Sequence, residues 1–177
     1  MSQRLTIDSI DDIGKVTPEN YGIYYKNMLD IGQEYQDFVV HTLYKRGIVL
    51  VNYQSRKYQI KHGENIMGAE IKKDRNFRNT GNLYIEINEK SHPHVMNKTD
   101  SGVLREDNGW LYIIGDEKTI YIFSTRSLKK LCEYYLKAGR VRVAGARTGT
   151  STGYLLPVAL ADEFYSLKIE IGEPEHE

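Results

Sequence analysis

The stretch "GAEIKKDRNFRNTGNLYIEINEK", residues 68–90, places acidic residues inside two segments that otherwise have the composition of β-strands. The first segment carries Glu70, Lys72 and Asp74, and the second carries Glu86. Strand side chains alternate between two faces, so Glu70, Lys72 and Asp74 share one face of the first strand. If the two strands are neighbours, three carboxylates and a lysine converge on one small patch.

Such a patch needs a proton or a cation. Two carboxylates about 4 Å apart repel each other by roughly 4 kcal/mol at an effective dielectric constant near 20. Mg²⁺ prefers oxygen ligands and keeps several waters, which suits attack on a phosphodiester. Lys72 would lie close enough to orient the attacking water or to hold a phosphate oxygen. The alternative is that these acids form the solvated face of half-exposed strands.

The segments around this stretch predict a mixed α/β domain. Apolar residues recur every three or four positions before Gly47, which is typical of a helix. The β-branched segment "GIVLVNY", residues 47–53, is typical of a buried strand. A hairpin, a basic helix and a further strand are expected at residues 110–124, 128–139 and 140–145. The order indicates a central mixed sheet flanked by helices.

Length and composition indicate one domain over residues 1–177, with a core at about 24–160, a polar N-terminal stretch and an acidic tail. Cys132 is the single cysteine, which excludes an intrachain disulfide and a cysteine-based zinc site. No apolar run approaches the roughly 20 residues that span a bilayer, and no signal-peptide pattern is present. These features predict a cytoplasmic protein with no membrane partner.

The charge distribution favours a phosphate-bearing partner. The chain has no net charge, but residues 53–78 hold seven basic residues against three acids, and residues 125–148 hold seven against one. Basic stretches on both sides of a carboxylate cluster are typical of a nucleic-acid footprint. Ordinary solvated faces are the alternative for either stretch. The candidate contacts to nucleic acid are Lys73, Arg75, Arg78, Lys129, Lys130, Arg140, Arg142 and Arg147.

The tripeptide Glu70-Ile71-Lys72 resembles the E-x-K element of the PD-(D/E)XK nuclease superfamily, whose restriction-endonuclease-like core runs helix, three strands, helix, strand. A glutamate in the first helix is common there, and Glu34 stands at that place. A longer string resembles a phage and prophage branch of the superfamily. Its members here are Glu70, Lys72, Asp74, Thr80, Gly81, Asn82, Glu86, Ser101 and Gly102.

The resemblance implies a restriction-endonuclease-like fold and a Mg²⁺-dependent DNA endonuclease, with Mn²⁺ as a possible substitute. It also implies a homodimer, because such enzymes commonly cut both strands as dimers. The implied catalytic residues are Glu34, Glu70, Lys72, Asp74 and Glu86. The implied metal ligands are Glu64, Glu70, Asp74 and Glu86.

No Pro-Asp dipeptide precedes Glu70, and this leaves two registers. In the first, Glu64 replaces the family aspartate and Glu70-x-Lys72 is the signature. In the second, Asp74 is that aspartate, Glu86 is the second ligand and Asn88 replaces the lysine. The sequence also leaves open a non-catalytic module on the same fold that binds nucleic acid or protein, and an RNA-cleaving enzyme with the same site.

Overall fold

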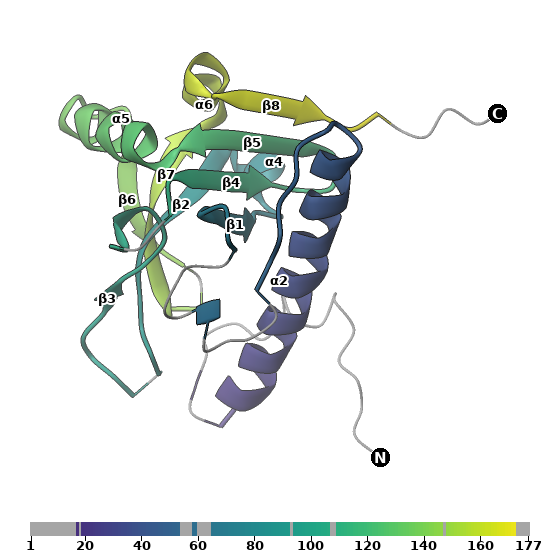
Figure 1. Cartoon of the computed structure of the whole chain (residues 1–177). Coiled ribbons are helices and arrows are strands. Elements are labelled where there is room, and N and C mark those ends of the chain that lie inside the picture. Colours follow the sequence, from purple (N-terminus) through teal and green to yellow (C-terminus); the bar gives the residue numbers. More distant parts are fainter. Residues whose placement is uncertain are drawn as a thin grey trace.

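The computed structural model describes residues 17, 19–53, 58–59, 65–92, 94–106, 109–146 and 148–172, and Figure 1 shows their arrangement. The helices are α2 (Tyr21–Tyr44), α4 (Phe77–Thr80), η1 (Gly102–Leu104), α5 (Thr125–Lys137) and α6 (Val158–Phe164). The strands are β1 (Ala69–Lys73), β2 (Asn82–Glu89), β3 (Thr99–Asp100), β4 (Leu111–Gly115), β5 (Thr119–Ser124), β6 (Arg142–Gly145), β7 (Ser151–Pro157) and β8 (Leu167–Glu170).

The strands form two sheets, which confirms the mixed α/β class but divides the expected central sheet. The first sheet has the order β1-β4-β5-β8, with β1 parallel to β4 and the other pairs antiparallel. The second has the order β3-β2-β7-β6 and is antiparallel throughout. β1 and β2 follow each other in the chain but belong to different sheets, so they do not form the neighbouring pair that the sequence suggested.

Helix α2 covers one face of the first sheet (Figure 1). Its residues Tyr35, Val39 and Leu43 recur every four positions and are buried against Ile71 and Ile113. A helix whose apolar side chains repeat at this spacing buries one stripe and leaves the rest in water. The predicted first helix is therefore confirmed, and Gly47 follows its end with a φ of 77°.

The opposite face of the first sheet packs against the second sheet and against α5. Tyr112 and Phe123 from the first sheet meet Ile85 from β2 in this core. Leu128 and Cys132 of α5 belong to the same cluster. Burial raises the pKa of the Cys132 thiol to about 12, in keeping with a packing role.

The prediction of a buried strand at residues 47–53 was wrong. Asn52 forms an isolated bridge with Asn65, and no named strand of the described chain includes it. Val49 and Val51 are more than half exposed. β-Branched composition favours a strand only where a pairing partner is available, and here the edge beside β1 is not filled by this segment.

No helix in the described ranges has the length and hydrophobicity needed to cross a membrane.

The predicted hairpin is confirmed as β4 and β5, and the basic helix is confirmed as α5. The sequence did not predict β3 or β8, which are short edge strands.

The turn before η1 packs directly on the backbone of β2. Gly102 is buried and has a φ of 52°, a left-handed conformation that side chains disfavour. A Cβ atom added at Gly102 would lie 2.3 Å from the carbonyl oxygen of Glu86. Only glycine fits this contact, which holds η1 against the strand that carries Glu86.

We expect Gly102→Ala to lower the free energy of unfolding by about 2–4 kcal/mol, because it adds both backbone strain and a clash. Gly139→Ala is the matched control, since Gly139 has a φ of 71° and no atom within 4 Å of an added Cβ. Urea denaturation of both variants measures the difference. Equal losses in the two variants would show that the contact with β2 contributes nothing.

Candidate functional site

Strand β1 presents Glu70 and Lys72 on the face that points toward the second sheet. Glu70 lies in register with Tyr112 and Lys72 with Ile114, and both β4 residues belong to the core between the sheets. The Glu70 side chain is only 7% exposed, and Lys72 Nζ lies 2.8 Å from Glu70 Oε1. A buried carboxylate needs such a partner, because an isolated charge in the interior is strongly unfavourable.

Glu86 of β2 reaches the same ammonium group from the second sheet. Its Oε1 atom lies 3.5 Å from Lys72 Nζ and accepts a hydrogen bond of 2.9 Å from Ser101 Oγ. The structure thus brings together Glu70, Lys72 and Glu86, although β1 and β2 do not pair. We call these three residues with Ser101 and Arg105 the carboxylate cluster.

The serine-glycine pair fixes Glu86 in this position. Ser101 is buried, its backbone N–H donates to the carbonyl of Ile87 at 3.0 Å, and its hydroxyl holds the Glu86 carboxylate. Gly102 permits the close approach described above. This assigns a physical role to the Ser-Gly element of the sequence string, which the residue pattern alone did not supply.

Arg105 completes the charge balance of the carboxylate cluster. Its Nη2 atom lies 3.6 Å from Glu70 Oε2, so two carboxylates face two cationic side chains. Sequence reasoning missed Arg105, which lies in a polar segment after η1 without a motif of its own. Tyr112 was missed too: its hydroxyl is buried beside the cluster, and burial raises its pKa well above the ordinary value.

A cavity of about 610 Å³ opens beside the carboxylate cluster. Lys72, Glu86 and Arg105 line one part of it. Residues of helix α2 form one wall, and Thr148, Thr150 and Ser151, where β7 begins, form another. Ligand sites commonly have volumes of about 300–1,000 Å³, so the cluster has direct access to a cavity of ordinary ligand size.

Asp74, which the sequence predicts as a metal ligand, makes three hydrogen bonds to the backbone. Its Oδ1 atom accepts hydrogen bonds of 3.0 Å from the N–H groups of Asn76 and Phe77, and Oδ2 accepts one of 2.8 Å from Tyr84. It therefore joins the start of α4 to β2. Burial raises the pKa of Asp74, while the three N–H donors oppose that rise.

The remaining predicted residues are dispersed. Glu34 is exposed on α2 and does not line the cavity, and Glu64 and Arg147 lie outside the described residues. Lys73 lines the cavity but forms an ion pair with Glu117, and Arg78 pairs with Asp116 at 2.6 Å. Four predicted basic residues lie on α5 or near β6, away from α2 in Figure 1, and do not line the cavity: Lys129, Lys130, Arg140 and Arg142. Arg75 does not line it either.

The donor atoms of the carboxylate cluster fit Mg²⁺ by their chemistry. Glu70, Glu86 and Ser101 offer hard oxygen atoms, and Mg²⁺ is commonly held by one or two carboxylates with water and substrate phosphate. Within the described residues, no group of three or more His, Cys, Asp or Glu is placed to hold a metal ion. Because Lys72 Nζ contacts Oε1 of both Glu70 and Glu86, a cation bound there would share these oxygen atoms with Lys72.

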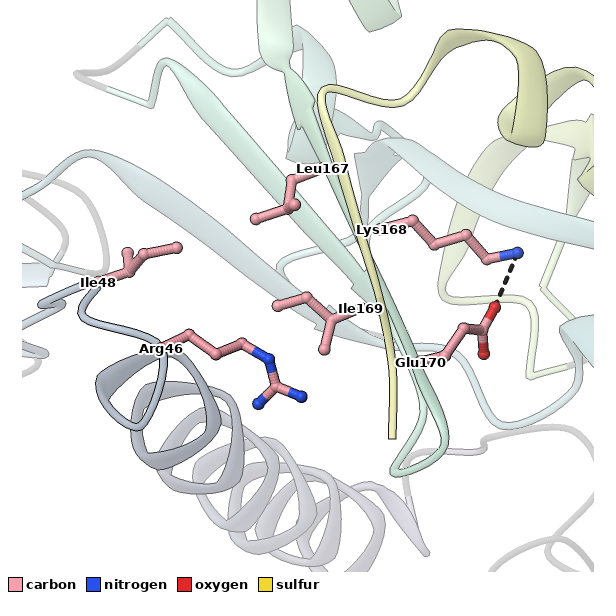
Figure 2. Close-up of a pocket in the computed structure, with 6 residues that line it drawn as sticks. All are labelled: Arg46, Ile48, Leu167, Lys168, Ile169 and Glu170. Atoms are coloured by element: carbon pink, nitrogen blue, oxygen red, sulfur yellow. Dashed lines mark ion pairs between the residues drawn. The ribbon is translucent and has the colours of Figure 1, made fainter. Parts of the chain in front are cut away.

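A second hollow, of about 400 Å³, lies between the end of α2 and β8 (Figure 2). Leu167 and Ile169 point to one side of β8, and Lys168 and Glu170 point to the other, where they form an ion pair of 2.8 Å. Because its lining lacks a pair of carboxylates, this hollow does not resemble the carboxylate cluster.

No protein-family model matches the chain, and no curated protein and no solved structure matches it. The resemblance to the PD-(D/E)XK nucleases stays a prediction that depends on the E-x-K tripeptide and the longer string. The geometry adds that Glu70, Lys72, Glu86 and Ser101 of that string are in contact with one another.

We expect Asp74→Ala to lower the free energy of unfolding by about 2 kcal/mol, because three backbone N–H groups lose their acceptor. Affinity for Mn²⁺, measured by calorimetry on the folded variant, should stay at the wild-type value. Asp30→Ala is the control, since Asp30 is exposed on α2. Unchanged stability together with weaker Mn²⁺ binding would instead make Asp74 a metal ligand.

Proposed function

We propose that this protein is a metal-dependent endonuclease that hydrolyses phosphodiester bonds in DNA at the carboxylate cluster. One observation carries the proposal: Lys72 lies between Glu70 and Glu86, two carboxylates from different sheets, at the edge of a cavity of about 610 Å³. The E-x-K spacing places the lysine and the first carboxylate on one strand face, and Glu86 supplies the second.

The fold supports the same proposal at a coarser level. Among α2, α5 and the strands of the first sheet, the order along the chain is α2, β1, β4, β5, α5 and β8. This order is compatible with the helix, strands, helix, strand order of a restriction-endonuclease-like core. α2 packs on the sheet whose edge strand carries Glu70 and Lys72. We therefore propose that α2 and the first sheet correspond to that core.

Each residue of the cluster has a role that its contacts suggest. Glu70 and Glu86 would hold Mg²⁺, or Mn²⁺ in its place, with Ser101 keeping Glu86 in position. The metal would supply a bound water of lowered pKa and positive charge beside the phosphate. Lys72 would orient that water from its position between the carboxylates, and Arg105 would contact a phosphate oxygen through its guanidinium group.

The proposed partner is DNA, and a homodimer would let one assembly cut both strands. The exposed basic residues of α5 and β6 would then contact DNA outside the cavity, where phosphate neutralisation provides most nonspecific affinity. A restriction-type enzyme and a structure-selective enzyme both fit this arrangement.

A second function is favoured by the charge balance of the cluster. Two carboxylates facing Lys72 and Arg105 already form a compensated network, which a non-catalytic module that binds nucleic acid could use for structure alone. Metal separates the two functions, since only the enzyme requires specific divalent binding that Glu70→Gln removes.

We expect Lys72→Ala to reduce DNA cleavage by about a hundredfold or more, because a positioned lysine contributes at that scale to proton transfer and water orientation. The assay uses supercoiled plasmid, a branched DNA junction and an RNA with the sequence of one junction strand. Each substrate is tested with Mg²⁺, with Mn²⁺ and with chelator. Lys118→Ala is the control, because Lys118 is exposed in the β4–β5 turn.

Discrete plasmid fragments would indicate a restriction-type enzyme, and cutting of the junction alone would indicate a structure-selective one. Cleavage that survives in Lys72→Ala, or no metal-dependent cleavage of any substrate by the wild-type protein, would overturn the nuclease proposal. Binding of DNA that is indifferent to metal and to Glu70→Gln would favour the non-catalytic module.

A further inference from the structure

We propose that the cavity beside the carboxylate cluster holds unpaired nucleotides, so that the substrate of the site is single-stranded nucleic acid. This inference rests on the proposed function, because it concerns the strand that would reach Lys72 and Glu86. It is carried by the size of the cavity, by the aromatic rings that line it and by the charges around it.

The size of the cavity favours a single strand. Its volume of about 610 Å³ is that of a small-ligand pocket, which suits one or two nucleotides and not a turn of duplex. The walls come from α2 on one side and from residues 148–151 on the other, with the cluster between them. A strand that entered would lie with its backbone beside Lys72 and Arg105.

Aromatic rings line the cavity, and two of them stack on neighbouring rings. Tyr24 and Tyr25 of α2 contribute to one wall, and Tyr53 contributes from the segment that precedes β1. Tyr25 stacks on Tyr21 with a centroid distance of 5.7 Å, and Tyr53 stacks on Tyr58 at 5.9 Å. Unpaired bases stack on such rings, whereas the bases of a duplex stack on each other and expose only their edges.

The charges of the described lining residues balance one another. Among the described lining residues, three cationic side chains (Lys72, Lys73 and Arg105) face three acidic ones (Asp37, Glu86 and Glu89). An excess of positive charge strengthens the binding of phosphates in a single strand as well as in a duplex, and the described lining residues supply no such excess. Base stacking, helped by the hydroxyl groups of Thr148, Thr150 and Ser151, is the remaining source of affinity.

The structure therefore selects, within the proposed function, an enzyme that acts on single-stranded regions such as flaps, gaps or the unpaired arms of branched DNA. A fully paired duplex would contact the exposed basic residues outside the cavity without placing a phosphate at the carboxylate cluster.

The test measures binding in chelator, where no cleavage occurs, by the fluorescence anisotropy of labelled oligonucleotides. The probes are a short single strand of thymidine, a blunt duplex of the same length, an abasic strand of the same length and a uridine RNA strand. We expect the wild-type protein to bind the thymidine strand about tenfold more tightly than the duplex or the abasic strand.

Substitutions at Tyr24 test whether the single strand binds in the cavity. Tyr24→Ala should weaken binding of the thymidine strand about tenfold, while Tyr24→Phe should retain it because the ring remains. Tyr44→Ala is the matched control, since Tyr44 lies on the same helix, is 67% exposed and does not line the cavity. The abasic probe tests stacking with wild-type protein, so the result does not depend on the folding of any variant.

Equal binding of single strand, abasic strand and duplex, or no binding of the single strand, would overturn the inference. Tighter binding of the RNA strand would support a single-stranded substrate and identify it as RNA. Binding of single strands through Tyr24 without any metal-dependent cleavage would support this inference and overturn the nuclease. Metal-dependent cleavage of duplex and single strand at the same rate, with equal binding of both, would support the nuclease and overturn this inference.

Discussion

The buried charge of Glu70 is the constraint on which the site depends. Its carboxylate is 7% exposed on the face of β1 that points into the core between the sheets, where an ionised group without a partner is strongly unfavourable. Lys72, two residues along the same strand, supplies that partner and also reaches Glu86 on the second sheet. The Lys72 ammonium group thus compensates the buried charge of Glu70. It also links the two sheets, because β1 and β2 do not pair with each other.

The same strand spacing explains why part of the site was predictable from sequence. Alternation of side chains places Glu70 and Lys72 on one face whatever the sheet around them, so their pairing follows from the tripeptide alone. The hairpin and α5 were predictable for a similar reason, because their periodicity is local. Glu86 approaches Lys72 from another sheet, so its contact was predicted correctly from an incorrect assumption about strand pairing.

What the sequence could not provide is the choice of tertiary partner. Asp74 has the spacing of a third ligand, and no pattern in the sequence indicates that the chain turns at the end of β1 and that the Asp74 carboxylate accepts hydrogen bonds from three backbone N–H groups. The segment at residues 47–53 has strand composition but no paired neighbour beyond one bridge at Asn52. Arg105 and Tyr112 carry no motif: the pairing of β4 with β1 brings Tyr112 beside Glu70, and the segment after η1 brings Arg105 to it.

The balance of charge within the carboxylate cluster affects the electrostatic potential of the cavity. Because Lys72 and Arg105 already compensate Glu70 and Glu86, the cluster adds no excess positive potential to the cavity. Under the proposed function, long-range attraction of nucleic acid would fall to the exposed basic residues of α5 and β6, which do not line the cavity. Selection at the cavity is left to short-range contacts, and tyrosine rings favour a strand whose bases are not already stacked in a duplex. In the proposed enzyme, attraction of nucleic acid and selection of its form would thus belong to different parts of the protein, which would let a chain with no net charge do both.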